Sequence, residues 1–172
     1  MTNSQPTTAF PPGTWAITPD TSITLTVKLL KMIDVTATLG LIDGTVAIAP
    51  DGTPTDVTAN VDATSFASGI ARRDEHIASD DFLDSTTYPL ITFSATQITM
   101  SQPEVQVGGT VTVRGVDAPL VLTVTDITIE DTTAELNATA MVDRSLLGVS
   151  KFPSFVIGHN VAVSLGVHLS VS

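Results

Sequence analysis

Residues 73–94 read RDEHIASDDFLDSTTYPLITFS, and this stretch passes from a charged segment through an acidic turn and a proline into an alternating segment. Its first half predicts a short helical insert near residues 70–83, with serine and aspartate available as caps. Tyr88-Pro89 then excludes helix, because proline restricts the preceding residue to extended backbone. The alternation of apolar and hydroxyl side chains over residues 91–95 predicts a half-buried strand.

Outward from this stretch, most of the chain alternates apolar and polar residues with the period of a β-strand. The clearest run is the last, where six apolar residues from Val161 to Val171 share one face. Asp43-Gly44 predicts a tight turn between two strands. The predicted strands cover residues 23–29, 35–41, 44–48, 57–63, 91–99, 105–113, 120–129, 134–142 and 161–171.

About eight strands joined by short connections predict an antiparallel sheet, since parallel strands need long crossovers. Long strands favour a closed up-and-down barrel over a flat sheet with two open edges. An immunoglobulin-like sandwich is the alternative, and the chain lacks its Cys–Trp–Cys signature. The predicted organisation is all-β, with a flexible N-terminal tail over residues 1–13 and one barrel domain over residues 14–172.

Composition narrows the function. The chain has 172 residues and a net charge of −11, which disfavours nucleic-acid binding and adhesion to anionic membrane surfaces. No apolar run approaches the ~20 residues that span a bilayer, so no stable membrane insertion is expected. The chain has no cysteine, which excludes disulfides and thiolate metal sites.

Three segments resemble the YceI-like family of lipid-binding proteins. Residues 73–94 are similar to its RD-x-HL-x-S-x-DFFD and YP-x-ITF motifs, with Ile77 and Leu83 in place of leucine and phenylalanine. Residues 107–119 and 143–148 resemble later elements of the family. Its N-terminal histidines are missing, since no histidine precedes His76. The resemblance implies a lipocalin-like barrel with a long internal cavity and a lipid as ligand.

An eight-stranded barrel can be filled by side chains or can hold one small ligand. Many predicted inward positions are Val, Ala or Thr, and aromatic residues make up 5% of the chain, which favours an open lumen. A long-chain isoprenoid, an isoprenoid quinone or a fatty-acid derivative would fill such a lumen. The alternative is a protein-interaction module with a filled barrel. The candidate ligand-binding residues are Leu25, Val27, Phe82, Leu83, Ile91, Phe93, Leu122, Val163 and Leu165.

The helical insert, with Phe82, Leu83 and Tyr88, is expected to act as a lid or cavity wall, or else to plug one end of the barrel. His76 is expected to hydrogen-bond the adjacent loop or to orient a headgroup. Arg72 and Arg73 are candidates for a headgroup contact at the cavity mouth, or for pairing with nearby aspartates.

No sequence pattern indicates catalysis, a cofactor or a metal site. The chain lacks a G-x-S-x-G elbow, a P-loop and a D-x-[DN]-x-[DN]-G calcium loop. His159 and His168 are nine residues apart and have no metal-ligand spacing. The acidic residues of 74–84 therefore indicate a solvated surface. The protein is expected to be a binding protein rather than an enzyme.

The first residues, MTNSQPTTAFPPGTW, lack the basic and apolar regions of a secretory signal. The expected location is the cytoplasm, or outside it if a leader precedes this sequence. The expected partner is a lipid, and a homodimer is left open.

Overall fold

The structure is a computed structural model that describes residues 10–101, 104–147, 157–158 and 160–171. Most of the described chain is β-strand, as the period-two alternation predicts. The strands are β1 (Gly13–Ile17), β2 (Ser22–Leu29), β3 (Ile33–Ile48), β4 (Pro54–Ala67), β5 (Leu90–Ser101), β6 (Glu104–Val113), β7 (Val116–Glu130), β8 (Thr133–Asp143) and β9 (Asn160–Val171). The helices are α1 (Ala71–Ala78) and the 3-10 helix η1 (Arg144–Leu147).

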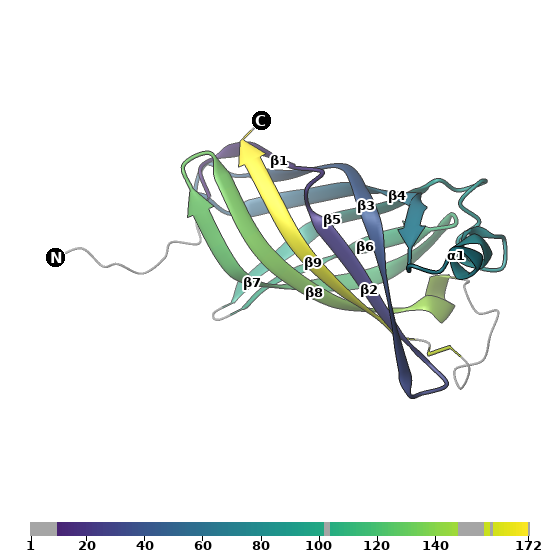
Figure 1. Cartoon of the computed structure of the whole chain (residues 1–172). Helices are drawn as coiled ribbons and strands as arrows, with labels where there is room; N and C mark the ends of the chain where they lie inside the picture. Colours follow the sequence, from purple (N-terminus) through teal and green to yellow (C-terminus); the bar gives the residue numbers. More distant parts are fainter. Residues whose placement is uncertain (1–9, 102–103, 148–156, 159, 172) are drawn as a thin grey trace.

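The strands form one closed antiparallel barrel (Figure 1). From β3 to β9 each strand pairs with the next one in the sequence. Strand β2 lies between β3 and β9 and so closes the ring. Strand β1 pairs with the same two neighbours, and Trp15 lies opposite both Val46 and Val171. Because β1 and β2 share one position, the barrel has eight strand positions. The predicted antiparallel eight-strand barrel is confirmed.

The backbone leaves the sheet between β1 and β2 and is held there by β9. The Thr18 amide donates to the His168 carbonyl oxygen at 2.9 Å, and the His168 amide donates to Thr21 Oγ1 at 3.0 Å. Side-chain and backbone groups thus replace the sheet hydrogen bonds that the interruption removes.

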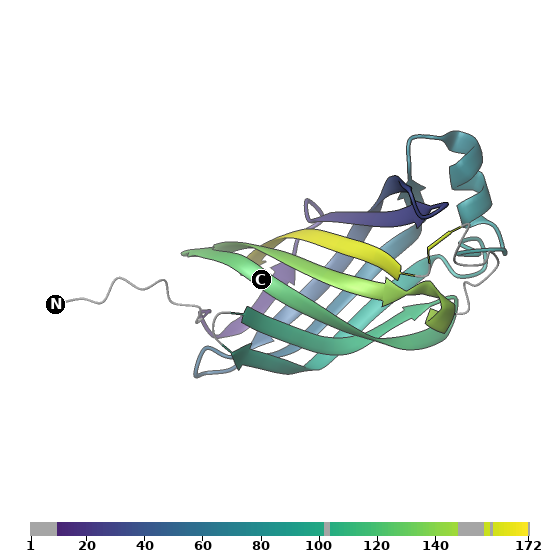
Figure 2. The same cartoon turned by 90° about the horizontal axis from the view of Figure 1, so that it is seen from below.

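The two ends of the barrel differ. The α1 end carries the β2–β3 hairpin, α1 between β4 and β5, the β6–β7 turn and η1 after β8. The opposite end carries the short turns that join β3 to β4 and β7 to β8, whereas the link from β1 to β2 lies partway along the barrel wall. Figures 1 and 2 show α1 and the β2–β3 hairpin at the same end in both views.

The inward side chains form two apolar clusters that meet in the middle of the barrel. At the opposite end, Trp15 is 1% exposed, and its ring contacts that of Phe10 edge-on with centroids 5.5 Å apart. Phe10 is also buried, and its amide donates to the Gly52 carbonyl oxygen. The ordered domain therefore begins before residue 14, and residues 1–9 of the predicted tail lie outside the described residues.

The predicted turn at Asp43-Gly44 is wrong, since β3 runs through both residues. The β3–β4 register shifts between Leu41 and Asp43, which marks an irregularity rather than a reversal. A Cβ atom at Gly44 would lie 2.8 Å from Ile17 Cδ1 and 2.8 Å from the Thr58 carbonyl oxygen. Gly44 is therefore required for close packing at this point of the barrel.

Candidate binding cavity

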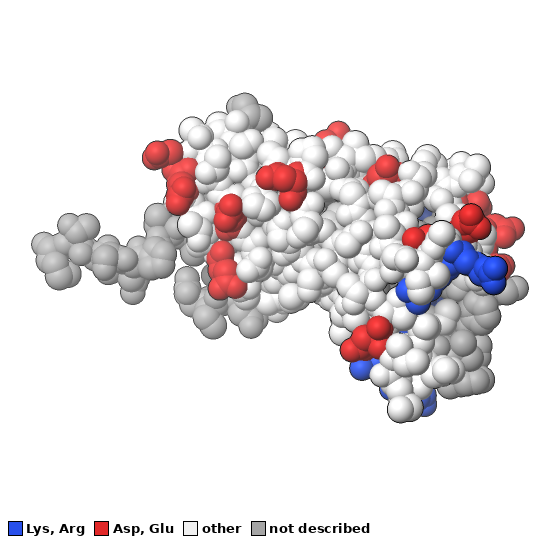
Figure 3. Space-filling view, viewed as in Figure 1, with Lys and Arg blue, Asp and Glu red and all other residues white. Residues whose placement is uncertain are grey.

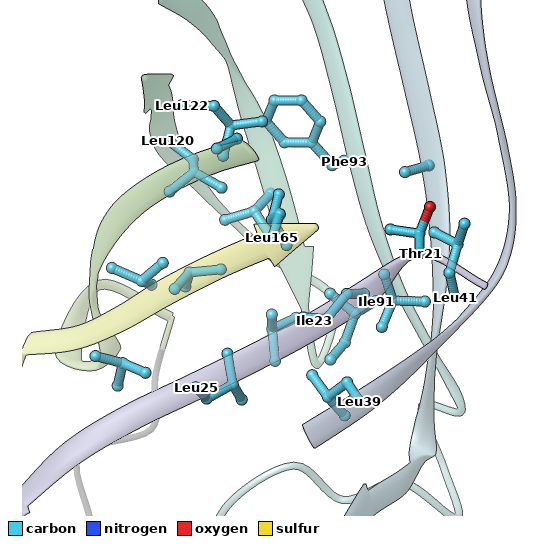
Figure 4. A pocket seen from close by; sticks show the side chains of 18 of the residues that line it. Thr21, Ile23, Leu25, Leu39, Leu41, Ile91, Phe93, Leu120, Leu122 and Leu165 are labelled. Carbon is cyan, nitrogen blue, oxygen red and sulfur yellow. The ribbon is translucent and has the colours of Figure 1, made fainter. Parts of the chain in front are cut away.

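The barrel encloses an apolar cavity of about 590 Å³. Every strand from β2 to β9 contributes inward side chains, and Figure 4 shows leucine, isoleucine and phenylalanine side chains converging on it. The volume falls in the range of roughly 300–1,000 Å³ that is typical of small-molecule sites. The lumen is therefore not filled by the protein's own side chains.

The cavity is long as well as apolar. On β9 its lining runs from Val161 to Leu169 at every second residue, and on β6 from Val105 to Val113. Each span covers about 27 Å along the strand at ~3.4 Å per residue. The shape suits an extended hydrocarbon chain better than a compact ring system.

All nine residues predicted to bind the ligand line the cavity. They belong to β2, β5, β7, β9 and the turn after α1. Leu25 lies opposite Val163 in the β2–β9 pairing, so their side chains share the inner face. That these residues contact a ligand stays a prediction.

Polar side chains are few along the described lining. Arg73, His76 and Arg144 come from α1 and η1, so all three lie at the α1 end. The other two are Thr21 and Thr92. The cavity is therefore apolar along most of its length, with basic side chains at one end.

Arg144 is 5% exposed and is held by backbone acceptors. Its guanidinium donates to the Ile157 carbonyl oxygen at 2.7 Å and to the Gly158 carbonyl oxygen at 3.0 Å. Burial lowers the pKa of Arg144, but arginine stays charged because its pKa begins so high. A fixed positive charge therefore lies beside the cavity.

Helix α1 presents Arg73, His76 and Ile77 to the cavity, and these positions share one helical face. The helix begins after Ile70. The preceding loop is tied to its first turn, because the Ser68 amide donates to Asp74 Oδ1 at 2.9 Å. Arg73 Nε donates to Ser68 Oγ at 2.9 Å, so its contact is with this serine. Arg72 does not line the cavity, and its predicted headgroup contact has no support in the geometry.

The turn after α1 forms a wall of the cavity. His76 Nε2 and Asp81 Oδ2 are 3.0 Å apart, which confirms the expected hydrogen bond to the adjacent loop. The His76 ring also meets Phe82 edge-on, with centroids 5.2 Å apart. Phe82 and Leu83 line the cavity, as expected for a wall, but Tyr88 does not. The Tyr88 ring lies outside, near Gly115 in the β6–β7 turn.

The remaining candidate residues lie elsewhere. His168 is on the outer face of β9, with Nδ1 3.4 Å from Glu135 Oε1, and His159 lies outside the described residues. Among the residues described, no group of three histidines, cysteines or carboxylates is placed to hold a metal ion. The sequence did not identify Arg144 as a cavity residue. Arg144 is far from α1 along the chain, and only the folded barrel brings the two to the same end.

A closed antiparallel barrel of eight strand positions with a ligand-sized apolar lumen has a lipocalin-like architecture. The YceI-like domain model matches residues 15–169, and the chain belongs to this family. This confirms the resemblance found in the sequence.

The matched relatives and structures are distant. A Shigella flexneri protein named YceI is 36% identical over 66 residues, covering 38% of this chain and 35% of the relative. A UPF0312 protein of Vibrio cholerae is 37% identical over 67 residues, with the same coverage. The aligned region thus spans about a third of each curated relative.

Similar solved structures share the fold at low identity. BcnA from Burkholderia cenocepacia has a TM-score of 0.75 at 17% identity, covering 86% of this chain and 95% of BcnA. A Saccharophagus degradans structure, described as a polyisoprenoid-binding domain, has a TM-score of 0.69 at 13% identity. That alignment covers 92% of this chain and 98% of the other.

Proposed function

We propose that this protein binds a long-chain amphiphilic lipid in the barrel cavity and carries or sequesters it. The ligand class includes polyisoprenoids, isoprenoid quinones and fatty-acid derivatives. The supporting observation is the long apolar cavity of about 590 Å³. Burying a lipid tail there contributes ~0.8 kcal/mol per methylene group.

The basic end of the cavity supports an amphiphile rather than a plain hydrocarbon. Arg73, His76 and Arg144 are the ionisable residues of the described lining, and their side chains can interact with a polar or anionic headgroup. The tail would then extend past Leu25, Phe93 and Leu165 toward the opposite end. Family membership and the polyisoprenoid-binding neighbour support the same ligand class.

Binding without catalysis is the function that the site supports best. The described lining offers hydrophobic surface along nearly its whole length, and its ionisable groups lie at one end. No helix in the described parts of the chain is long and apolar enough to cross a membrane.

Thermal denaturation with and without lipid tests the proposal. A ligand that binds only the folded state raises the Tm, by an amount equivalent to ~2.7 kcal/mol at a hundredfold excess over Kd. We expect farnesyl or longer isoprenoids and long-chain fatty acids to raise the Tm, and short-chain analogues to have little effect. An unchanged Tm across the panel would contradict lipid binding.

A further inference from the structure

The β2–β3 hairpin projects from the barrel at the α1 end (Figure 1), and its tip carries exposed apolar side chains. Leu30 is 60% exposed, Met32 84% and Ile33 56%. Lys28 and Lys31 flank them, and Lys28 Nζ contacts Asp34 Oδ1 at 2.8 Å. Three neighbouring large apolar side chains in water are unfavourable unless a partner covers them.

The tip also holds an unfavourable backbone conformation. Leu30 and Lys31 have φ angles of 52° and 61°, and the Met32 amide donates to the Leu29 carbonyl oxygen at 3.1 Å. The bond closes a β-turn whose two central residues both have positive φ, a conformation for which Asn-Gly is the preferred sequence because bulky residues rarely adopt positive φ. Leu30 and Lys31 therefore occupy positions at which the backbone conformation favours other residues.

The apolar surface of the tip is continuous with the cavity. Along the hairpin, the cross-strand pairs Leu25–Ala37, Val27–Val35 and Leu29–Ile33 all lie on the inner face. The first two pairs and Leu29 line the cavity, whereas Ile33 is beyond its lining. An apolar track therefore leads from the lumen to the tip.

Charge is unevenly distributed between the two ends. All described lysines and arginines lie at the α1 end: Lys28, Lys31, Arg72, Arg73, Arg114 and Arg144. In Figure 3 the blue side chains gather at this end, while red ones occur at both. Acidic residues on α1 and its following turn accompany the arginines, so the hairpin is the most basic projection. The described part of the opposite end has acidic residues, among them Asp51, Glu130 and Asp131, and no lysine or arginine.

We infer that the β2–β3 tip docks this protein on a phospholipid bilayer, with Leu30, Met32 and Ile33 inserted among the lipids. Lys31 then lies at headgroup level, as basic residues do beside an inserted apolar surface. The acidic opposite end points away from an anionic surface. The docked orientation places the apolar track between the bilayer and the cavity, so the track is the route by which lipid exchanges between them. The role in lipid exchange rests on the proposed function.

Vesicle cosedimentation with the full chain tests the docking. The double variant Leu30→Asn, Met32→Thr should bind phosphatidylcholine vesicles at least tenfold more weakly, because it removes most of the inserted surface. Asparagine tolerates the positive φ at residue 30, so the variant should fold at least as well as the wild type. The matched control is Val121→Thr, which changes a 51% exposed residue on β7 and should leave vesicle binding unchanged.

The charge contribution is measured separately with Lys31→Gly. This variant should bind vesicles containing phosphatidylglycerol about fivefold more weakly, with little change on phosphatidylcholine alone. Equal binding of the wild type and the double variant, or no wild-type binding, would overturn the docking. A double variant that instead converts a dimer to a monomer in size-exclusion chromatography would identify the tip as a self-association surface and also overturn it.

Binding of a fluorescent long-chain fatty acid in detergent-free buffer distinguishes this inference from the proposed function. The double variant should retain full affinity for the free fatty acid, since Leu30 and Met32 do not line the cavity. If the wild type binds vesicles but not the fatty acid, docking stands and lipid carriage fails. If it binds the fatty acid but not vesicles, carriage stands and docking fails.

Discussion

Replacing Ala59 by leucine should narrow the cavity at its middle without unfolding the barrel. Ala59 is half-buried, lines the cavity and packs against both apolar clusters. The change adds about three carbon atoms, which displace about three methylene groups of a bound tail. At ~0.8 kcal/mol each, the ligand loses about 2.4 kcal/mol, or roughly fiftyfold in Kd.

The same substitution distinguishes a hollow lumen from a filled one. In a packed core, the added carbons would cost ~1–3 kcal/mol and lower the Tm by roughly 2–4 °C per kcal/mol. In a hollow barrel they occupy free space, so the Tm of the ligand-free protein should stay constant or rise.

Fluorescent fatty-acid titration and thermal denaturation supply the two readouts. Ala162→Leu is the matched control, because Ala162 is on β9 next to Val163 but faces away from the cavity. The reasoning is refuted if Ala59→Leu changes the Kd by less than about threefold, or if it destabilises the ligand-free protein as a filled core requires.

Four further changes test the cavity wall, the sheet and the polar groups. Phe82→Asp should abolish lipid retention, because it places a carboxylate in the apolar wall, while the β-sheet circular dichroism persists; retained lipid would rule out this wall. Gly109→Ala should destabilise folding by ~2–4 kcal/mol in urea denaturation, because its Cβ would overlap the Ser94 carbonyl oxygen. Gly108→Ala is the tolerated control, since the atom nearest to its added Cβ, the Gln97 carbonyl oxygen, is 3.6 Å away. Arg144→Lys should cost ~1–3 kcal/mol, because an ammonium cannot reproduce the paired contacts to Ile157 and Gly158. Hydrogen bonds from Thr53 lower the pKa of Asp51, so its stabilising effect is present above its ordinary pKa near ~3.9 and lost as pH falls through the lower folded value. Asp51→Asn should therefore flatten the acid limb of a Tm-against-pH curve, and an unchanged limb would contradict this assignment.

The sequence predicted the barrel because its strands alternate so regularly. From Val161 to Leu169 each inward residue is apolar, and this pattern alone identifies the inner face of β9. The predicted inward faces of β2 and β9 are correct, since Leu25, Val163 and Leu165 all line the cavity. The error at Asp43-Gly44 arose because a dipeptide typical of turns also serves where a strand is irregular and closely packed.

The polar end of the cavity could not be predicted in the same way. Arg73 and Arg144 lie on separate helical segments, and only the closed barrel brings both to one end. The net charge of −11 was also insufficient to predict membrane docking, because it disfavours adhesion to a membrane only if the charge is evenly spread. The positions of Lys28 and Lys31 beside an exposed apolar tip depend on the hairpin, which has no Asn-Gly signal in the sequence.

Lipid carriage is tested most directly by native mass spectrometry of the protein purified from its own source cells, before and after organic extraction. We expect a stoichiometric mass excess that extraction removes, with a long-chain amphiphile in the extract. A protein of ligand-free mass, together with an empty extract and no binding of isoprenoids or fatty acids, would contradict the account.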